Sequence, residues 1–193
     1  MSETIDNNKQ IAKYIAPILG INPTARRHWD EENKKSIDIF TVIDPLHTNI
    51  QFHGTLGVSE AQLKINNEIQ NFSLELIIGA DKEFTDTPNI LATCGFYIIK
   101  DHWECKPGAV FMDMVKMYYD SLEMKHIYFN VPFVWDDKLK PLQLPDKKIV
   151  WLLAIPISDK ELKYKTENGD KALQELFKKH QIDVFDLNRK SIV

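Results

Sequence analysis

The most apolar run of the chain covers residues 149–157, IVWLLAIPI. Alternate residues of an extended strand point to opposite faces. Because this run is apolar at nearly every position, it predicts a central strand that is covered on both faces. One face would carry Trp151, Leu153 and Ile155, and the other would carry Leu152 and Ala154.

Other alternating or apolar runs predict further strands of a sheet. They cover residues 25–29, 36–43, 50–58, 72–78 and 126–134. Pro132 interrupts the last run, so that strand should end there or lie at a sheet edge. Residues 62–69 contain Asn66-Asn67 and predict a small hairpin, whereas the spacing in residues 111–119 does not decide between helix and irregular structure.

Helical spacing first occurs in residues 6–19, where apolar positions share one face and Gly20 marks the end. A second helix should begin at Thr87, which can act as an N-cap, with Pro88 in its first turn. Its apolar residues fall on two nearly opposite sides. One side has Ile90, Leu91, Cys94, Tyr97 and Ile98, and the other has Ala92, Phe96, Ile99 and Trp103.

A helix that is apolar on two sides is not an ordinary surface helix. The simpler interpretation is a core helix followed by the Pro107-Gly108 turn. The alternative is a helix with one face in the core and its Tyr97-to-Trp103 end at a partner site. The residues alone leave both interpretations open.

Two short helices should follow the apolar strand. Ser158 and Glu161 have the spacing of a capping box, and this helix should end at Asn168-Gly169. Asp170 should cap the last helix, and residues 182–193 leave room for a last strand. No linker divides the chain, so we expect one domain over residues 1–193. The predicted fold class is α+β, with a mixed, mainly antiparallel sheet flanked by helices.

Composition narrows the classes of partner. The chain has 193 residues and a formal charge of -4, with no basic stripe, which argues against a nucleic-acid surface. Mild acidity would suit a basic protein partner. No apolar run is long enough to span a membrane, and the polar N-terminus MSETIDNNKQ is not a secretory signal. Cys94 and Cys105 are then expected to be free thiols of a cytoplasmic protein.

The sequence contains no G-x-S-x-G, no phosphate-binding glycine loop and no H-E-x-x-H. Cys94, His102 and Cys105 could be combined into a metal site, but the C-x-x-C pairs typical of zinc sites are missing. We therefore expect no metal and no cofactor.

Acid–base chemistry has weak candidates in this sequence. His28 lies close to Asp30 in the chain, and His47 lies close to His53. Spacing alone does not bring either pair to a substrate, and histidines on strands are more often packed or solvated. An enzyme that uses His28, Asp30 and His53 stays open as an alternative to a binding protein.

An ordered set of segments carries a family resemblance. The segments are HGTLGVSE, FSLELIIGAD, ILATCGFYIIKDHW, KPGAVF, KHIYFNVPFVW, IVWLLAIPISDKELKYKTENGDKALQELF and DLNRKSIV. Together they resemble the Suppressor of fused domain family, from the first helix to the C-terminus. The resemblance implies a mixed sheet flanked by helices and a binding role without known catalysis. Compact bacterial members are immunity proteins, or antitoxins, of secreted polymorphic toxins that include nucleases.

The resemblance carries over only one part of the peptide site of the animal members. Their helix tyrosine corresponds to Tyr97, but the aspartate that follows it corresponds to Ala109 here. A charge-assisted contact is therefore not available at Ala109. The animal proteins also close a second domain over the peptide, so we expect a flatter protein–protein surface in this chain.

These observations predict a non-catalytic immunity protein that binds a cognate toxin domain, with a general regulatory adaptor as the alternative. Its contact surface should combine exposed aromatic and acidic side chains on two loops, with a helix tyrosine beside them. The expected partner-binding residues are Tyr97, Asp101, Trp103, Glu104, Trp135, Asp136 and Asp137. The competing interpretation is that Trp103 belongs to the core and that residues 135–137 form an ordinary polar turn.

Overall fold

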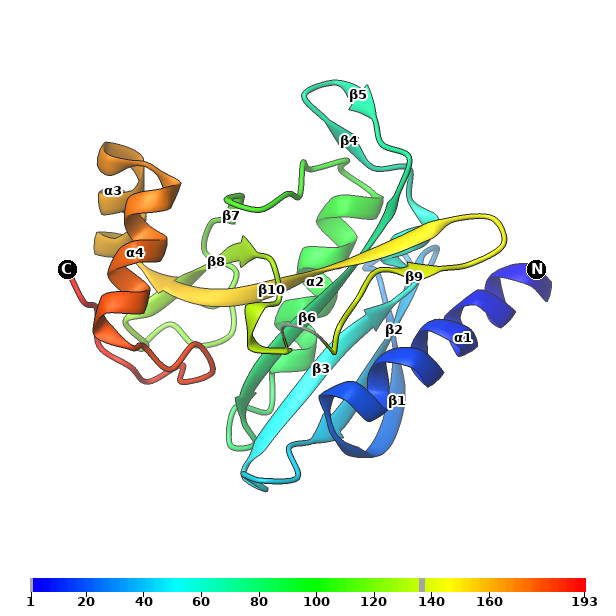
Figure 1. Ribbon diagram of the computed structural model, residues 1–193, viewed down its shortest axis with the longest axis horizontal. Helices are drawn as coiled ribbons and strands as arrows, with labels where there is room; N and C mark the ends of the chain where they lie inside the picture. Colours follow the sequence, from blue (N-terminus) through cyan, green and yellow to red (C-terminus); the bar gives the residue numbers. More distant parts are fainter. Residues whose placement is uncertain (1, 136–137) are drawn as a thin grey trace.

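The computed structural model describes residues 2–135 and 138–193, which form a twisted sheet with helices on both faces (Figure 1). The strands lie in the order β1-β2-β3-β6-β10-β8-β7, and β9 pairs with β10. β6 and β10 are parallel to each other, and the remaining neighbours are antiparallel. The predicted α+β class with a mixed, mainly antiparallel sheet is therefore confirmed.

The strands and helices have the following bounds. The strands of the sheet are β1 Ile21–Trp29, β2 Ser36–Ile43, β3 Ile50–Leu56, β6 Ser73–Asp81, β7 Val110–Phe111, β8 Met124–Asn130, β9 Leu142–Gln143 and β10 Lys148–Ser158. The helices are α1 Ser2–Leu19, α2 Thr87–Ile99, α3 Asp159–Asn168 and α4 Asp170–His180, with 3-10 turns η1 Val58–Glu60 and η2 Phe133–Trp135. β4 Lys64–Ile65 and β5 Glu68–Ile69 form the predicted small hairpin. In the described part of the chain, no helix has both the length and the apolar character needed to cross a bilayer.

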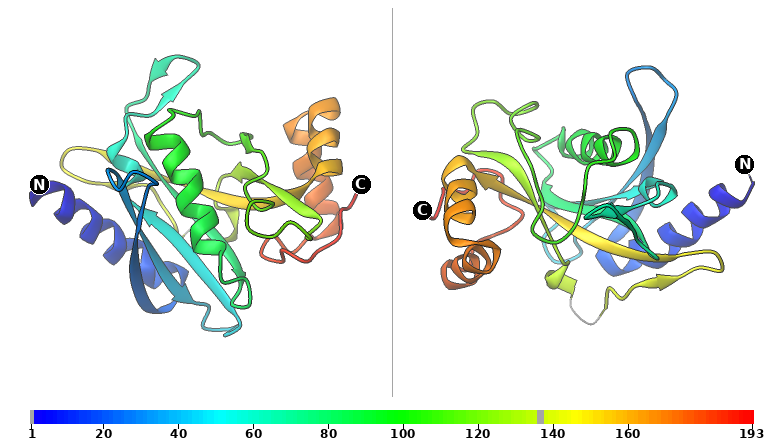
Figure 2. Two further views of the ribbon diagram at one scale, coloured as in Figure 1. Left: turned by 180° about the vertical axis from the view of Figure 1, so that it is seen from behind. Right: turned by 90° about the horizontal axis from the view of Figure 1, so that it is seen from above.

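The sheet separates two apolar cores, one on each face. Leu152 and Ala154 of β10 lie in the core that α2 covers. Trp151, Leu153 and Ile155 lie in the opposite core, which contains residues of α1 and α4. The two faces predicted for this strand are confirmed, and Figure 2 shows α2 and α1 on opposite sides of the sheet.

α2 packs closely on the sheet, because a glycine faces β2. A Cβ atom at Gly95 would lie 2.6 Å from Cδ1 of Ile37, so only glycine fits here without a shift. Pro88 lies in the first turn, as predicted, but the N-cap position belongs to Asp86 and not to Thr87. The Thr87 hydroxyl instead donates to the Phe84 carbonyl oxygen at 2.7 Å.

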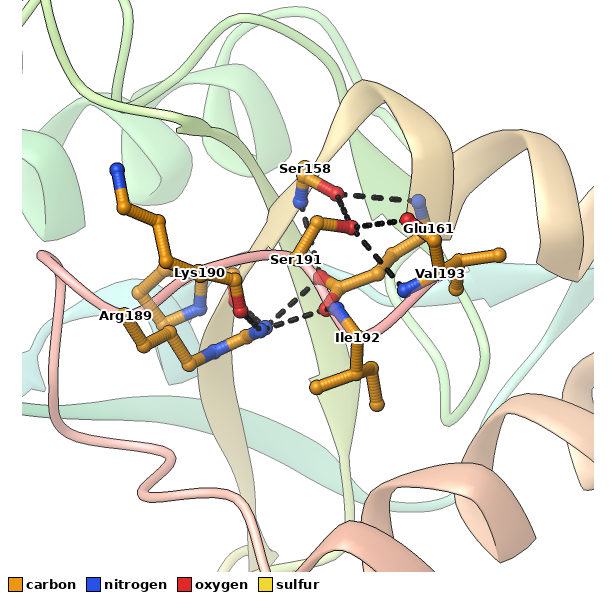
Figure 3. Close-up of polar contacts among 8 residues, drawn as sticks. Ser158, Glu161, Arg189, Lys190, Ser191, Ile192 and Val193 are labelled. Atoms are coloured by element: carbon orange, nitrogen blue, oxygen red, sulfur yellow. Dashed lines mark hydrogen bonds and ion pairs between the residues drawn. The ribbon is translucent and has the colours of Figure 1, made fainter.

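A buried ion pair fastens the C-terminal segment to the start of α3 (Figure 3). Arg189 donates to both carboxylate oxygens of Glu161, at 2.6 and 2.8 Å, and to the Pro156 carbonyl oxygen at 2.7 Å. Glu161 also accepts the Ser158 N–H, and its own N–H donates to the Ser158 hydroxyl, which confirms the predicted capping box. The strand predicted within residues 182–193 is wrong, because this segment folds inward around Arg189 and pairs with no strand of the sheet in the described chain.

The predicted cap of the last helix is also wrong. The N-cap position of α4 belongs to Gly169, whose φ of 90° suits glycine. The Asp170 carboxylate instead accepts hydrogen bonds from the Tyr128 hydroxyl at 2.9 Å and from the Gln174 amide at 2.7 Å. Asp170 therefore joins α4 to β8.

Candidate functional site

Two sequence-predicted site residues form a rigid aromatic pair at the end of α2. The rings of Tyr97 and Trp103 stack with centroids 4.2 Å apart, and Trp103 meets Phe111 edge-on at 5.0 Å. His102 has a φ of 55°, which turns the chain back, and the Trp103 N–H donates to the Tyr97 carbonyl oxygen. Trp103 is 40% exposed, so it belongs partly to the core and partly to the surface.

A cleft of about 680 Å³ lies beside this pair, between β1 and α2. We call it the β1–α2 cleft. Tyr97 and Asp101 line it from the α2 side, and Arg26 and His28 line it from β1. Two predicted site residues therefore line a cleft. A contact between the end of β1 and the end of α2 joins its two walls.

That contact is the ion pair between Lys100 Nζ and Asp30 Oδ2, at 3.0 Å. Desolvation opposes ionisation of Asp30, but hydrogen bonds from the Lys35 N–H, from Lys100 and from the Lys34 N–H outweigh it and lower the pKa of the carboxyl. The same hydrogen bond raises the pKa of Lys100. Both groups therefore stay charged near neutral pH and tie the end of β1 to the end of α2.

The Glu104 carboxylate makes contacts within the molecule. Its carboxylate accepts the Asn66 N–H at 2.7 Å and forms an ion pair with Lys106 at 3.1 Å. The hydrogen bonds from Lys106 and from Asn66 lower the pKa of Glu104. Glu104 thereby holds the β4–β5 hairpin beside the loop that carries Trp103.

The second predicted loop does not join the first. Trp135 is only 9% exposed and packs edge-on against Phe52, with ring centroids 5.1 Å apart. It belongs to the core on the α1 side of the sheet, whereas Tyr97 packs against the core on the α2 side. The expectation that Trp135 is an exposed aromatic side chain of the contact surface is therefore wrong. Asp136 and Asp137, also predicted as partner-binding residues, lie outside the described residues.

The residues of the enzyme alternative do not meet at one surface. His53 is 3% exposed and its Nδ1 lies 2.8 Å from the Thr41 hydroxyl. Burial, with a smaller contribution from His28, lowers the pKa of His53 to about 4. Burial, followed by the charge of Arg26, also lowers the pKa of His28. His53 is therefore a neutral side chain inside the sheet, away from the surface of the cleft that His28 and Asp30 line.

The two cysteines are both buried, and both are free thiols. Burial raises the pKa of Cys94 and of Cys105, so neither is a thiolate near neutral pH. Among residues 2–135 and 138–193, no group of three or more His, Cys, Asp or Glu side chains could hold a metal ion. Cys94, His102 and Cys105 thus do not converge on a site.

We predict that these thiols are chemically idle. A disulfide reagent should label Cys94 and Cys105 in the native protein only as fast as the protein unfolds, because the reactive thiolate form is rare and covered. The single variants Cys94→Ala and Cys105→Ala should keep partner binding within about tenfold. Rapid labelling of the native protein, or stoichiometric zinc that the double variant loses, would contradict this prediction.

An exposed apolar surface escaped the sequence analysis. β8 ends at Asn130, and the next residues, Val131, Phe133 and Val134, are 52%, 44% and 42% exposed. With Phe177 and other residues of α4 and the segment after it, Val131 and Phe133 line a groove of about 740 Å³, which we call the apolar groove. The signal was present in the apolar residues around Pro132, but they were interpreted only as part of a strand that should end at Pro132 or lie at a sheet edge.

Comparison with known proteins agrees with this architecture. The family described as "Suppressor of fused protein (SUFU)" matches residues 33–190. A Bacillus subtilis (strain 168) protein named Immunity protein YqcF is 37% identical over 188 residues, which are 96% of this chain and 97% of that protein.

Solved structures share the fold at low sequence identity. A SUFU homolog from Neisseria gonorrhoeae FA 1090 has a TM-score of 0.77 at 15% identity and covers 98% of both chains. The Sufu–Fu complex has a TM-score of 0.68 at 11% identity, over 96% of this chain and 92% of that chain. The family match, the extended identity and the shared fold agree, and this chain belongs to the Suppressor of fused family.

Proposed function

We propose that this protein is an immunity protein, which binds a cognate protein toxin and neutralises it by forming a stoichiometric complex. The observation that carries the proposal is its similarity, over nearly the whole chain, to a relative named as an immunity protein. This similarity extends over nearly the whole chain and does not depend on one motif. The names of the family and of this relative support a non-enzymatic role.

The proposed partner is a secreted nuclease domain, and the proposed place of action is the cytoplasm. A nuclease surface that holds phosphates is basic, and the formal charge of -4 on this chain would attract it. Long-range attraction of this kind raises the association rate, whereas a few buried contacts hold the complex together. The net charge supports the encounter and does not by itself define the contact surface.

The working surface that we propose is the β1–α2 cleft with the aromatic pair beside it. Tyr97 and Trp103 are pre-stacked and partly exposed, so a partner would bury apolar area without ordering new side chains. Asp101 lines the same cleft and supplies a negative charge at the rim. Ala109 leaves no carboxylate where the animal members have one, so Tyr97 would act through its ring.

The decisive experiment starts from the gene that lies directly upstream of this one. Its product, if it is a toxin, is expressed in a susceptible strain with and without this protein, and both purified proteins are mixed in a titration. We expect growth only in the presence of this protein, and full inhibition at about one molecule per toxin molecule. Protection by much less than one equivalent would indicate an enzyme, and binding to a non-toxic product would indicate a regulatory adaptor.

We predict that Trp103→Ala weakens toxin binding by about 2 kcal/mol or more, because a rigid, half-exposed tryptophan is a typical hot spot. The loss should lie mainly in faster dissociation. Asp101→Lys should instead slow association with a basic toxin at low salt, and this effect should shrink as salt is added. Binding kinetics at two salt concentrations, with a melting curve for each variant, measure both effects.

Phe133→Ala is the comparison variant for this prediction. It removes a partly exposed aromatic side chain from the apolar groove, which our proposal does not use. We expect its toxin affinity to stay close to that of the wild type. If Phe133→Ala disrupts binding while Trp103→Ala does not, the toxin binds at the apolar groove and the proposed surface is wrong.

A further inference from the structure

β1 is an edge strand with an open side. It forms the end of the sheet and pairs with β2 (Figure 1). Along its whole length the residues are exposed, except for His28, which is half-buried. Backbone N–H and C=O groups on the free side of such a strand can pair with a strand from another protein.

The hairpin that joins β1 to β2 shows which groups face outward. The Asp30 N–H donates to the Lys35 carbonyl oxygen at 3.0 Å, so at Asp30 the N–H points toward β2. The β1–β2 register is regular from Thr24 to Trp29, and the direction of the N–H alternates along a strand. The backbone groups that point away from β2 are therefore those of Ala25, Arg27 and Trp29.

The side chains of this edge divide between the two faces of the sheet. Arg26 and His28 pair across the strands with Ile39 and Ile37, which belong to the core under α2. They therefore face α2 and line the β1–α2 cleft. The Arg27 side chain extends toward Asp38 on the other face of the sheet, although Arg27 also belongs to the lining of the cleft.

The two arginines differ in how far their charges are compensated. Arg27 makes a bidentate ion pair with Asp38, at 2.7 and 2.9 Å. For Arg26, the described residues supply no ion pair. Arg26 thus places a positive charge on the β1 wall of the cleft, whereas the negative charge of Asp101 lies on the α2 wall.

The charge of Arg26 favours one of two occupants of the free edge, a second copy of the chain or an acidic strand of another protein. A second copy of the chain would bring Arg26 and Arg27 close to the same residues of its partner, and like charges on neighbouring strands repel. Pro23 and the irregular register between Ile21 and Thr24 also shorten the length of β1 that can pair regularly. A strand with carboxylate side chains would meet the arginine without this repulsion.

We propose that β1 accepts an extended, acidic segment of the partner protein as an additional strand of the sheet. This rests on the proposed function in so far as the partner is the toxin. The segment pairs with the outward backbone groups of Ala25, Arg27 and Trp29, and one of its carboxylates faces Arg26 at the mouth of the cleft. The side chains next to that carboxylate reach the Tyr97 side of the cleft, so the edge and Tyr97 belong to one continuous surface.

The first test uses the wild-type protein and needs no toxin. Amide hydrogen exchange is followed by NMR with a synthetic peptide of about ten residues in which glutamate alternates with threonine or valine. Without peptide, the amides of Ala25, Arg27 and Trp29 should exchange fast, and those of Arg26 and His28 should be protected. Saturating peptide should slow the three fast amides by roughly tenfold.

A matched peptide with lysine in place of glutamate is the control, and it should bind at least about tenfold more weakly. Unchanged exchange at Ala25, Arg27 and Trp29 with millimolar acidic peptide would overturn the proposal. Equal protection by the lysine peptide would overturn the choice of an acidic occupant. Protection that rises with protein concentration alone, together with a dimer in sedimentation, would assign the edge to a second copy instead.

The second test uses the toxin domain and a proline variant. Ala25→Pro removes one outward N–H but leaves the groups that face β2, and proline is tolerated on the free side of an edge strand. Ala25→Ser keeps the N–H and is the matched control. We expect Ala25→Pro to lose about tenfold in toxin affinity with an unchanged melting temperature, and Ala25→Ser to bind like the wild type.

The two tests separate the two proposals. If the wild-type protein does not bind the toxin, the proposed function fails, and the peptide experiment still decides whether the edge accepts a strand. If the toxin binds and folded Ala25→Pro binds it as well as Ala25→Ser does, the strand addition is refuted and the proposed function stands. Should Ala25→Pro not fold, the exchange experiment on the wild type carries the decision alone.

Discussion

Arg189→Ala should destabilise the fold by about 3–5 kcal/mol, because it leaves the Glu161 carboxylate buried without its counter-charge. Glu161 is fully buried and Arg189 is 9% exposed. Arg189 also donates to the Pro156 carbonyl oxygen, so the substitution removes a further hydrogen bond at the end of β10. Denaturant unfolding, with the free energy extrapolated to water, measures the loss.

Lys190→Ala is the matched control for this prediction. Lys190 is the next residue, but its side chain is 88% exposed and its ion pair with Glu123 is long, at 3.7 Å. A surface pair of this kind contributes little, so we expect a change within about 0.5 kcal/mol. If Arg189→Ala were as stable as Lys190→Ala, the buried pair would not hold the C-terminal segment.

A double variant tests the physical cause. Arg189→Leu with Glu161→Leu removes both charges, so no unpaired carboxylate remains in the core. It should lose less stability than Arg189→Ala with Glu161 left in place. It should still lose about 1 kcal/mol through the capping box, because the Ser158 N–H no longer has the Glu161 carboxylate as a partner.

The features that sequence reasoning predicted correctly depend on neighbours along the chain. Residues 36–43 begin with alternating polar and apolar side chains and carry apolar residues on both faces further on, and β2 has these bounds in the structure. The capping box needs only Ser158 and Glu161, which lie within one helical turn. The two faces of β10 follow from the alternation of side chains along any strand. Such signals do not require knowledge of the rest of the fold.

The features that were missed depend on residues far apart in the chain. Polar residues follow Trp135 in the sequence, which suggested an exposed loop. In the structure, Phe52 and Phe185 pack against its ring and bury it. The hydrogen bond from the Asn66 N–H of the β4–β5 hairpin to the Glu104 carboxylate was also not predicted, and a partner contact of Glu104 stays a prediction. No local pattern encodes these contacts, because they form only when the elements pack.

The aromatic pair of the candidate site was predicted in part. The helical spacing put Tyr97 and Trp103 on nearly opposite sides of one helix, but α2 ends at Ile99. Their stacking instead depends on the left-handed backbone of His102, which reverses the chain after the helix. A positive φ at a histidine is uncommon and has no reliable sequence signal. The sequence therefore singled out both residues but did not predict the geometry that joins them.

Leu153→Ala should cost about 2–5 kcal/mol, because it opens a cavity in the middle of the sheet. Leu153 is fully buried and lies between Ile77 of β6 and Asn130 of β8. Neighbouring strands on both sides hold the backbone in place, so the site cannot collapse to fill the space. Leu153→Met, which nearly conserves the volume, should lose less than about 1.5 kcal/mol.

Leu46→Ala is the exposed control for this substitution. Leu46 is 84% exposed, so its replacement should change stability by no more than about 0.5 kcal/mol. Amide hydrogen exchange tests the same placement without a mutation, since the amides of residues 150–155 should open only with the whole fold. Fast exchange across these residues, or equal stability of Leu153→Ala and Leu46→Ala, would show that β10 is not the centre of the sheet. Slow exchange together with a large loss for Leu153→Ala would place β10 at the centre of the sheet, where its other face contributes Leu152 and Ala154 to the second core.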